Sequence, residues 1–260
     1  CWHRGLLSLL DIDPALLPAS FEGPEVTGTL TAGAAAQTGL PAGIPVVAGG
    51  GDQAANGVGC GIVRKGVVSA SLGTSGVLFA FADTVSTDPE GRVHTFCHSV
   101  PGCWHTMGVV LSAAGSLQWF RNQLWTNEWV RAKAEGREVY EEITTAAGTA
   151  PAGSEGLLFL PYLTGERTPH KDPFARAAFI GLSLRHTRAH MARAVLEGVA
   201  YAMNDSTEIM RGMGVAVDEV RCSGGGARSA LWRQIMADVN AAPMVTINVD
   251  EGPAYGAAIL

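Results

Sequence analysis

Apolar residues recur at strand-like spacing in the first half of this chain and at helical spacing later on. Two β-rich runs, 67–72 and 77–81, flank the turn Gly73-Thr74-Ser75-Gly76, a pattern typical of a β-hairpin. An apolar run at 44–48 that enters Gly49-Gly50-Gly51 predicts a buried strand. Shorter runs predict further strands at 93–100, 104–109, 157–160, 219–223 and 244–249.

The strongest helical pattern covers 186–213, where Met191, Val195, Val199, Met203 and Met210 share one face. A second helix is predicted at 112–125, with Ser112 as its N-cap. The charged stretch 128–147 predicts an exposed helical region. Other helices are expected at 53–60, at 227–239 and from Pro253 onwards. Strands that alternate with helices in this way indicate an α/β domain.

Composition narrows the class of protein. Apolar residues make up 47% of the chain and charged residues 16%, which excludes intrinsic disorder. A formal net charge of −6 argues against a nucleic-acid partner for the chain as a whole. No apolar run reaches the roughly 18 residues of a membrane span, so no membrane partner is expected. Five cysteines, an odd number, favour free thiols and a cytoplasmic location.

The two ends of the sequence suggest a piece of a longer protein. The chain begins with Cys1 rather than methionine, and no signal-peptide pattern follows it. The run 255–260 stops within an apolar, helix-favouring stretch. We therefore expect more protein on both sides of these residues.

Three glycine-rich segments carry the candidate chemistry, and the first is the hairpin turn 71–76. Two hydroxyl groups and several unshielded backbone N–H groups at such a turn can cradle phosphate oxygens. The same residues are also common in an ordinary hairpin turn, and the turn alone favours that reading.

The second segment, 222–229, joins a predicted strand to a predicted helix through Gly224-Gly225-Gly226. Bare backbone beside a helix N-terminus suits a nucleotide. A dinucleotide fingerprint is an alternative, with Gly224 and Gly226 in its first two glycine positions, Ser229 in place of the third, and Asp250 as the ribose-binding acid. A tight strand-to-helix turn without a ligand is the third interpretation.

The third segment is Gly49-Gly50-Gly51-Asp52-Gln53. A carboxylate that follows three glycines at a strand end is open to a ligand and can accept a hydroxyl proton during phosphoryl transfer. The more common role for Asp at this point is the N-cap of the next helix. The two roles exclude each other only if capping occupies both carboxylate oxygens.

A group of histidines and cysteines between 94 and 105 resembles a zinc site at first sight. Its spacing does not match a pair of zinc-binding knuckles, and strand alternation would send neighbouring side chains to opposite faces. We assign no metal ligand to this group, which consists of His94, Cys97, His98, Cys103 and His105.

The three segments recur in this order in one family, and the chain resembles the FGGY carbohydrate kinases along nearly its whole length. The stretch 177–197 fits the family's second signature throughout. The segment GERTPH at 165–170 favours family members that phosphorylate D-xylulose over those that phosphorylate glycerol, although gluconate-directed members share part of it. The other matching stretches are VVAGGGDQAANGVGCG (46–61), SASLGTSG (69–76), LFLPYLTGERTPH (158–170) and SGGGARSALW (223–232).

The resemblance implies a ribonuclease-H-like, actin-like ATPase fold of the α/β class, with two domains around a cleft. Residues 1–45 would be the remnant of the N-terminal domain, and 46–260 would be a C-terminal, nucleotide-binding domain truncated at its end. The implied reaction is the ATP-dependent phosphorylation of a ketopentose, D-xylulose, to D-xylulose 5-phosphate. The implied cofactors are ATP and Mg²⁺, the partners are the sugar and ATP, and a homodimer is compatible with the family.

By resemblance, Asp52 is the catalytic base, and Asp52 and Gln53 contact the sugar. The nucleotide-binding positions are Gly73, Thr74, Ser75, Gln118, Gly225, Gly226 and Ser229, with Arg228 nearby. Ala114 replaces the glycine that usually precedes the position of Gln118.

One family feature is missing from the sequence. The phosphate hairpin whose acid helps to hold Mg²⁺ does not occur in this chain, so we assign no metal ligand and expect the chain alone to transfer phosphate poorly. The alternatives are a kinase for another sugar or polyol, a catalytically silent ATP-binding module, and an NAD-dependent enzyme.

Overall fold

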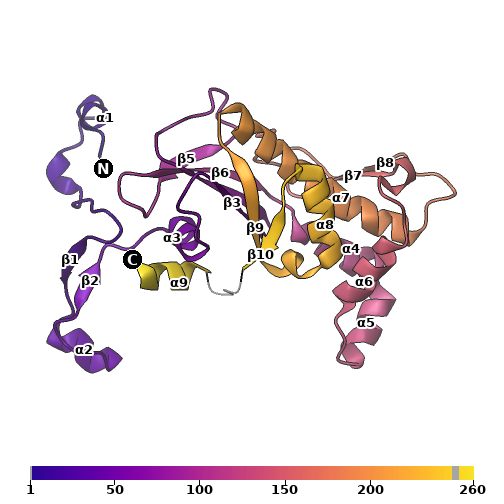
Figure 1. Ribbon diagram of the computed structural model, residues 1–260, viewed down its shortest axis with the longest axis horizontal. Helices are drawn as coiled ribbons and strands as arrows, with labels where there is room; N and C mark the ends of the chain where they lie inside the picture. The colour runs from indigo at the N-terminus through magenta and orange to yellow at the C-terminus, as the bar shows by residue number, and fades with distance from the viewer. Residues whose placement is uncertain (1, 248–251) are drawn as a thin grey trace.

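The computed structural model describes residues 2–247 and 252–260 (Figure 1). Its helices are α1 (Arg4–Leu9), α2 (Ala32–Thr38), α3 (Asp52–Gly59), α4 (Ala114–Leu124), α5 (Thr126–Ala134), α6 (Val139–Gly148), α7 (Arg188–Gly212), α8 (Ala230–Asn240) and α9 (Gly252–Ile259), with short 3-10 turns η1 (Pro14–Leu16), η2 (Ser154–Gly156) and η3 (Gly225–Arg228). Its strands are β1 (Val26–Thr29), β2 (Pro45–Val47), β3 (Gly66–Leu72), β4 (Gly76–Ala82), β5 (His94–Cys97), β6 (Trp104–Val110), β7 (Leu158–Leu160), β8 (Ala178–Ile180), β9 (Val217–Ser223) and β10 (Met244–Thr246).

A six-stranded sheet in the order β10-β9-β3-β4-β6-β5 forms the centre of the molecule. Strands β3 and β4 pair antiparallel with Leu72 opposite Gly76, which confirms the predicted hairpin. Strand β9 runs parallel to both β3 and β10, whereas β4, β6 and β5 pair antiparallel. The carboxyl ends of β3 and β9 therefore meet at one edge of the sheet, as the two nucleotide segments require.

Helices cover both faces of this sheet (Figure 1). On one face the long helix α7 packs so tightly against β4 that a Cβ added to Gly76 would collide with Met203. The opposite face carries α3 and α9. Along β4, Leu78 belongs to the large core with α7, while Phe79 belongs to a small second cluster with Ile62. This alternation is the period of two expected of a sheet buried on both faces.

Helix α3 lies across the strands rather than along them. Its C-terminal end is tied to β9, because the Cys60 carbonyl accepts a hydrogen bond of 2.7 Å from Nη1 of Arg221. Its middle lies against β4, where Gly57 faces the ring of Phe79. The glycine loop before the helix reaches Ser99, in the turn between β5 and β6. Asp52 is thus carried toward the β5–β6 side of the sheet.

Helices α3 and α9 touch through their backbones. A Cβ added to Gly59 would collide with the Gly252 carbonyl oxygen, and one added to Gly256 would collide with the Ala55 carbonyl oxygen. Glycine at these positions lets the two helix axes approach far more closely than ordinary side chains permit. The small residues of α3 are therefore a packing requirement.

Residues 2–47, here called the N-terminal arm, contain the two-stranded ribbon β1–β2 (Figure 1). They lie beside the rest of the molecule, which includes the six-stranded sheet and is here called the body. Leu7 and Gly23 are the buried residues of the arm, and its other positions are exposed or half-buried. The strand predicted at 44–48 exists as β2, but its predicted burial is wrong. Its residues are exposed or half-buried because β2 pairs only with β1, and no second layer covers this two-stranded ribbon.

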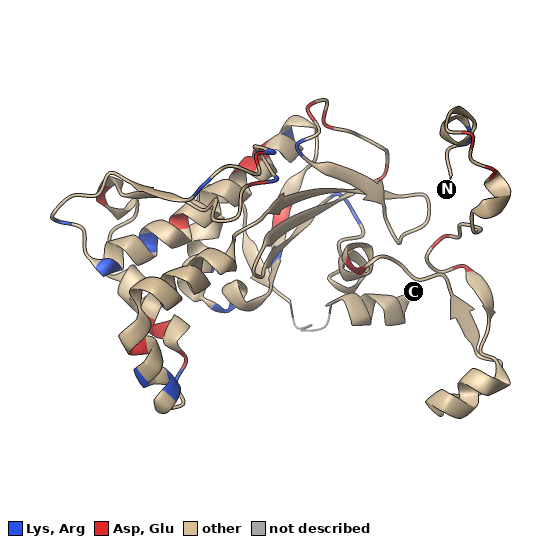
Figure 2. Cartoon of the chain, turned by 180° about the vertical axis from the view of Figure 1, so that it is seen from behind, with Lys and Arg blue, Asp and Glu red and all other residues tan. Residues whose placement is uncertain are grey.

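Two other expectations need correction. Ser112 does not cap α4, because Ala113 occupies that position and the Ser112 hydroxyl instead lies 3.1 Å from Thr164 Oγ1. The stretch 128–147 forms parts of α5 and α6, and it is only partly exposed, because Ala132 and Ile143 are buried. Its charged residues are spread along this projecting pair of helices (Figure 2), and Arg131 of α5 pairs with Glu142 of α6 at 3.5 Å.

The remaining predicted elements agree with the structure, with shifted ends. Helix α7 lies within the predicted range 186–213, while the helix predicted from 227 begins at Ala230, after the turn η3. Strand β10 covers the start of the stretch predicted at 244–249, of which 248 and 249 lie outside the described residues. Across 2–247 and 252–260, no helix is long and apolar enough to span a membrane.

Candidate functional site

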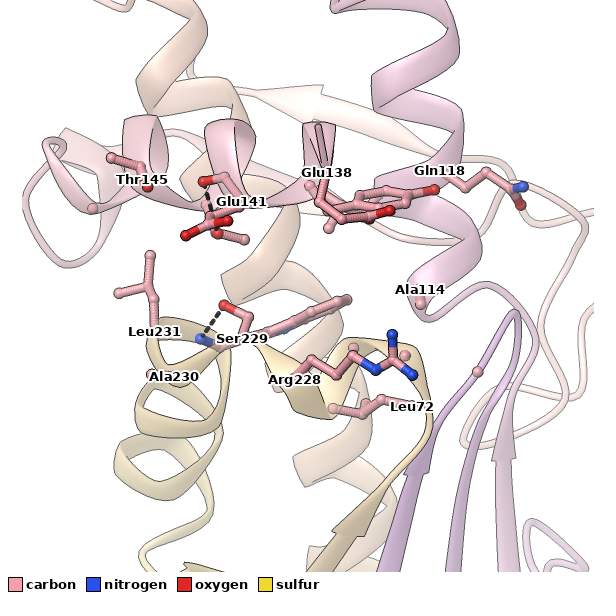
Figure 3. Close-up of a pocket in the computed structure, with 18 of the residues that line it drawn as sticks. Leu72, Ala114, Gln118, Glu138, Glu141, Thr145, Arg228, Ser229, Ala230 and Leu231 are labelled. Atoms are coloured by element: carbon pink, nitrogen blue, oxygen red, sulfur yellow. Dashed lines mark hydrogen bonds between the residues drawn. The ribbon is translucent and has the colours of Figure 1, made fainter. Parts of the chain in front are cut away.

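A cavity of about 960 Å³ opens beyond the carboxyl ends of β3 and β9. Its walls come from the hairpin turn after β3, from helices α4 and α6, and from the turn η3 with the start of α8 (Figure 3). Six of the residues predicted to bind nucleotide line it together: Gly73, Thr74, Gln118, Gly225, Gly226 and Ser229. Ser75, predicted with them, is not among the lining residues.

The two walls of the cavity differ in charge. Glu138, Glu141 and Thr145 stand on the wall formed by α6, and Arg228 and Ser229 stand on the facing wall (Figure 3). The helix N-terminus of α8 opens on the arginine side, where its partial positive charge adds to that of the guanidinium. One wall thus suits an anionic group and the other suits hydroxyl or amino donors.

The glycine turn after β9 explains why side chains are missing there. Gly224 has φ +83°, and a Cβ at this position would lie 2.8 Å from the Leu72 carbonyl carbon. A Cβ on Gly226 would lie 2.9 Å from the Trp232 ring. Gly225 has no atom within 4 Å of its would-be Cβ and lines the cavity. Packing therefore demands two of the three glycines, and the middle one leaves backbone open to a ligand.

Ser229 caps a helix in addition to lining the cavity. Its side chain is the N-cap of α8 and accepts a hydrogen bond of 3.2 Å from the Trp232 N–H. A capping hydroxyl still has its own hydrogen to donate, so Ser229 can also donate to a group in the cavity.

The hairpin turn presents its backbone in two directions. Its carbonyl groups face the start of α4, where the Ala114 N–H donates to the Gly73 oxygen at 2.9 Å and the Ala113 N–H donates to the Thr74 oxygen at 2.9 Å. Within the described part of the chain, the N–H groups of Gly73, Thr74 and Ser75 donate no hydrogen bond. Adjacent unused N–H groups at a turn are the type of concavity that binds phosphate.

Asp52 is the first residue of α3, and Gly51 holds the N-cap position. The capping role considered for Asp52 is therefore wrong. The side chain is exposed, and its Oδ1 accepts the Gln53 N–H at 2.8 Å. Among the described residues no hydrogen bond reaches Oδ2. Neither Asp52 nor Gln53 lines the cavity, because both lie on the α3 side of the sheet.

Two of the histidines that resembled a zinc site, His98 and His105, pack on the α3 side of the sheet. The His105 ring stacks on Phe79 at a centroid distance of 4.2 Å, and His98 Nε2 lies 3.1 Å from the Ile62 carbonyl oxygen. Burial, together with nearby His98, lowers the pKa of His105 to about 4, so the ring is neutral at pH 7. Residues 2–247 and 252–260 contain no group of three or more His, Cys, Asp or Glu that is placed to hold a metal ion.

Glu166 is a residue of interest that the sequence reasoning did not single out. Its Oε1 accepts the Leu111 N–H at 3.0 Å and the Arg167 N–H at 2.7 Å. The residue is 3% exposed, Oε2 has no partner among the described residues, and burial raises the pKa of the carboxyl group. The signal in the sequence was an acid between Gly165 and Thr168, close behind an apolar strand.

The fold meets one requirement of the dinucleotide alternative. Gly224 and Gly226 form the turn after β9 as that alternative requires, but a 3-10 turn separates them from α8. Asp250, the proposed ribose-binding acid, lies outside the described residues.

Family comparisons identify both parts of the chain. The FGGY family of carbohydrate kinases, C-terminal domain, matches residues 68–260. The N-terminal domain of the same family matches residues 1–59. The domain boundary at residue 45 stays a prediction.

Individual relatives agree with this assignment. The xylulose kinase of Escherichia coli is 43% identical over 260 residues, covering 100% of this chain and 51% of the relative. The gluconokinase of Bacillus subtilis is 33% identical over 264 residues, covering 100% of this chain and 50% of the relative. The chain thus spans about half the length of these relatives.

A solved structure extends the similarity to the fold. The crystal structure of xylulose kinase from Rhodospirillum rubrum superimposes with a TM-score of 0.88 at 36% identity, over 99% of this chain and 50% of that one. The predicted fold class, an α/β fold of the actin-like, ribonuclease-H-like type, is confirmed. The chain belongs to the FGGY family of carbohydrate kinases.

Proposed function

We propose that this chain is the nucleotide-binding part of a kinase that transfers the γ-phosphoryl group of ATP to D-xylulose and so forms D-xylulose 5-phosphate. The observation that carries the kinase proposal is the cavity, which gathers six predicted nucleotide-binding residues beside unused N–H groups. The choice of sugar rests on the similarity to xylulose kinases. A similar gluconokinase makes another sugar of the same family the alternative.

In this proposal the nucleotide lies along the cavity. The adenosine part rests on the bare backbone of Gly225 and Gly226, near Ser229 and Gln118. The phosphates extend to the turn Gly73-Thr74-Ser75, where the free N–H groups neutralise part of their charge. Positioning and charge stabilisation of this kind supply most of the catalysis in phosphoryl transfer.

Asp52 is the proposed general base, and Gln53 the neighbouring sugar contact. The Asp52 carboxylate removes the proton from the terminal hydroxyl of the sugar while that oxygen forms a bond to the γ-phosphorus, and the bond to the β,γ-bridging oxygen breaks to release ADP. The exposed side chain and its unoccupied Oδ2 support this role. A negative charge at the first turn of α3 is also favoured by the helix dipole.

Mg²⁺ is implied by the family, and no described residue is assigned as its ligand. The described residues contain no group of three or more acidic or other metal-binding side chains. No step proposed for the residues of this chain involves the ion. The boundary between a remnant at 1–45 and a second domain at 46–260, a cytoplasmic location and a homodimer are part of the same proposal.

Two alternatives make different predictions about ligands. A silent ATP-binding module would bind ATP without turnover, and an NAD-dependent enzyme would bind NAD. A ligand that binds only the folded chain raises its melting temperature, so thermal protection by ATP and not by NAD supports the kinase over the NAD-dependent enzyme.

The direct test is Asp52→Asn in the complete kinase, measured by coupled ADP release with D-xylulose. We expect kcat to fall by about 10²–10⁴-fold, as for loss of a general base, while ATP affinity stays within about twofold. The matched control is Asp13→Asn, because Asp13 is also an exposed aspartate that accepts one backbone N–H at a helix start. Full turnover of Asp52→Asn would remove Asp52 from the mechanism.

A further inference from the structure

The phosphate-facing turn is held from outside the hairpin as well as by the pairing of β3 with β4. Its carbonyl groups are fixed by the segment 111–115, here called the α4 loop. In this loop the Ala114 N–H donates to Gly73, and the Ala113 and Gly115 N–H groups converge on the Thr74 oxygen at 2.9 and 3.1 Å. A Cβ on Gly115 would lie 2.9 Å from that same oxygen, so the contact is close. Any shift of the α4 loop must move the hairpin with it.

The α4 loop is in turn fixed by the segment 164–168, here called the strap. Glu166 Oε1 accepts the Leu111 N–H at 3.0 Å, and Thr168 Oγ1 accepts the Val109 N–H at 3.2 Å, just before the loop. At the other end of the strap, the hydroxyl groups of Thr164 and Ser112 lie 3.1 Å apart. Three side chains of one short segment thus hold the end of β6 and the loop that follows it.

Glu166 is the central contact of the strap. A hydrogen bond from a backbone N–H to a carboxylate is about twice as strong as one between neutral groups, and Oε1 accepts two of them. The side chain is nine-tenths buried or more, and it leaves Oε2 without a partner among the described residues. Burial of a carboxylate is costly, so a neutral acceptor would serve simple packing better.

We propose that Glu166 is a positioning residue for the nucleotide phosphates, acting through Leu111 and the α4 loop on the hairpin Gly73-Thr74-Ser75. The proposal rests on the proposed function, since it assumes that this hairpin contacts phosphate. Glu166 does not line the cavity and touches no ligand in this scheme. Its effect is to keep three N–H groups in place, and misplacement by about 1 Å is enough to lower phosphoryl transfer strongly.

This role makes a selective prediction for ligand binding to the full chain, measured by titration calorimetry with ATP and with adenosine. The base and ribose would contact chiefly the glycine turn and the start of α8, with Gln118 as their one contact on α4, so Glu166→Ala should weaken ATP about tenfold and adenosine only about twofold. Glu166→Gln retains an acceptor oxygen for Leu111 and should recover most of the ATP affinity. A merely structural role would weaken both ligands equally.

Glu197→Ala is the matched control. Glu197 is 4% exposed, and its Oε1 accepts a backbone N–H from Gly153 at 3.0 Å and the Nε–H of Arg193 at 2.7 Å; among the described residues it makes no hydrogen bond to the α4 loop. This variant should lose stability without changing the ratio of ATP to adenosine affinity. Should Glu166→Ala fail to fold, Thr164→Val removes a partner of Ser112 at an exposed position and should change the ratio in the same direction, by about threefold.

The two proposals fail in different ways. If the unaltered chain binds ATP no more tightly than adenosine, then the proposed phosphate site is wrong, and so is the role of Glu166. The positioning role alone would be wrong if the unaltered chain binds ATP more tightly than adenosine and the Glu166 and Thr164 variants keep the same ratio of ATP to adenosine affinity. A changed ratio in these variants and an unchanged one in Glu197→Ala supports it.

Discussion

The body and the N-terminal arm of this molecule differ in how many of their apolar side chains are buried. In the body, helices cover both faces of a six-stranded sheet, and a large set of side chains is fully buried. In the arm, a two-stranded ribbon and short helices leave Trp2, Leu9 and Phe21 in the open. The proposed nucleotide cavity lies wholly in the body, and Asp52 is the first residue of α3, five positions after the arm. Both parts of the proposed site are therefore carried by elements of the body, and the arm ends just before the glycine loop that leads to Asp52.

The largest expected contrast is between the same substitution in the two regions. Leu196→Ala, at a fully buried position of α7, should lower the free energy of unfolding by about 2–5 kcal/mol because it leaves a cavity. Leu9→Ala, at a position 79% exposed, should change it by less than about 0.5 kcal/mol. Urea denaturation measures both. Equal losses would mean that the arm has a core of its own in solution.

A second contrast concerns glycine. Gly224→Ala introduces a Cβ against Leu72 at a backbone conformation with φ +83° and ψ 172°, and it should cost about 3 kcal/mol. Gly39→Ala, in the arm, has φ +75° but no neighbouring atom within 4 Å, and it should cost only about 1 kcal/mol. Thermal unfolding of both variants checks the difference. A cost at Gly39 as large as that at Gly224 would show that backbone conformation, rather than packing, decides.

A third effect depends on pH and concerns the buried His105 of β6, whose ring stacks on Phe79. The pKa of His105 is lowered to about 4 in the folded state, whereas an unfolded histidine has a pKa near 6.5. Between these values the unfolded chain binds the proton and the folded chain does not. Stability is therefore complete above about pH 6.5 and falls as the pH drops toward 4, by roughly 3 kcal/mol.

His105→Phe should remove that part of the pH dependence. The variant keeps a ring stacked on Phe79 and deletes the buried Nδ1, which has no partner among the described residues. Its unfolding free energy, measured from pH 7 to pH 4.5, should fall less steeply than that of the unaltered chain. An unchanged slope would assign the acid sensitivity to other groups.

Local sequence signals predicted the elements of the body well. The turn Gly73-Thr74-Ser75-Gly76 lies between two β-rich runs, and such a turn determines the pairing of its own flanking strands. Helix α7 was equally clear because its buried residues repeat at helical spacing. The glycines of the second nucleotide segment were identified correctly as a turn, and their packing against Leu72 gives the reason.

The wrong predictions concern residues whose contacts or burial depend on a segment that is distant in the sequence. Ser112 has the residue type of an N-cap, but Thr164 lies beside its hydroxyl, and no local pattern reveals a partner 52 residues away. An apolar run at 44–48 indicates a strand, yet its burial depends on whether another layer covers it. Glu166 was missed for the same reason, since its partner Leu111 is distant in the sequence. The sequence could therefore predict the nucleotide turns, but not the strap that holds one of them.

The backbone contact between α3 and α9 has a consequence for how this chain acquires its structure during synthesis. Helix α3 has eight residues and contains Asn56, Gly57 and Gly59, which are poor helix formers, so it is marginal in isolation. Its closest neighbour, α9, is translated almost two hundred residues later. We therefore expect the helix that bears Asp52 to reach its final packing on the ribosome only when nearly all of this sequence has emerged, long after the β3–β4 hairpin can form.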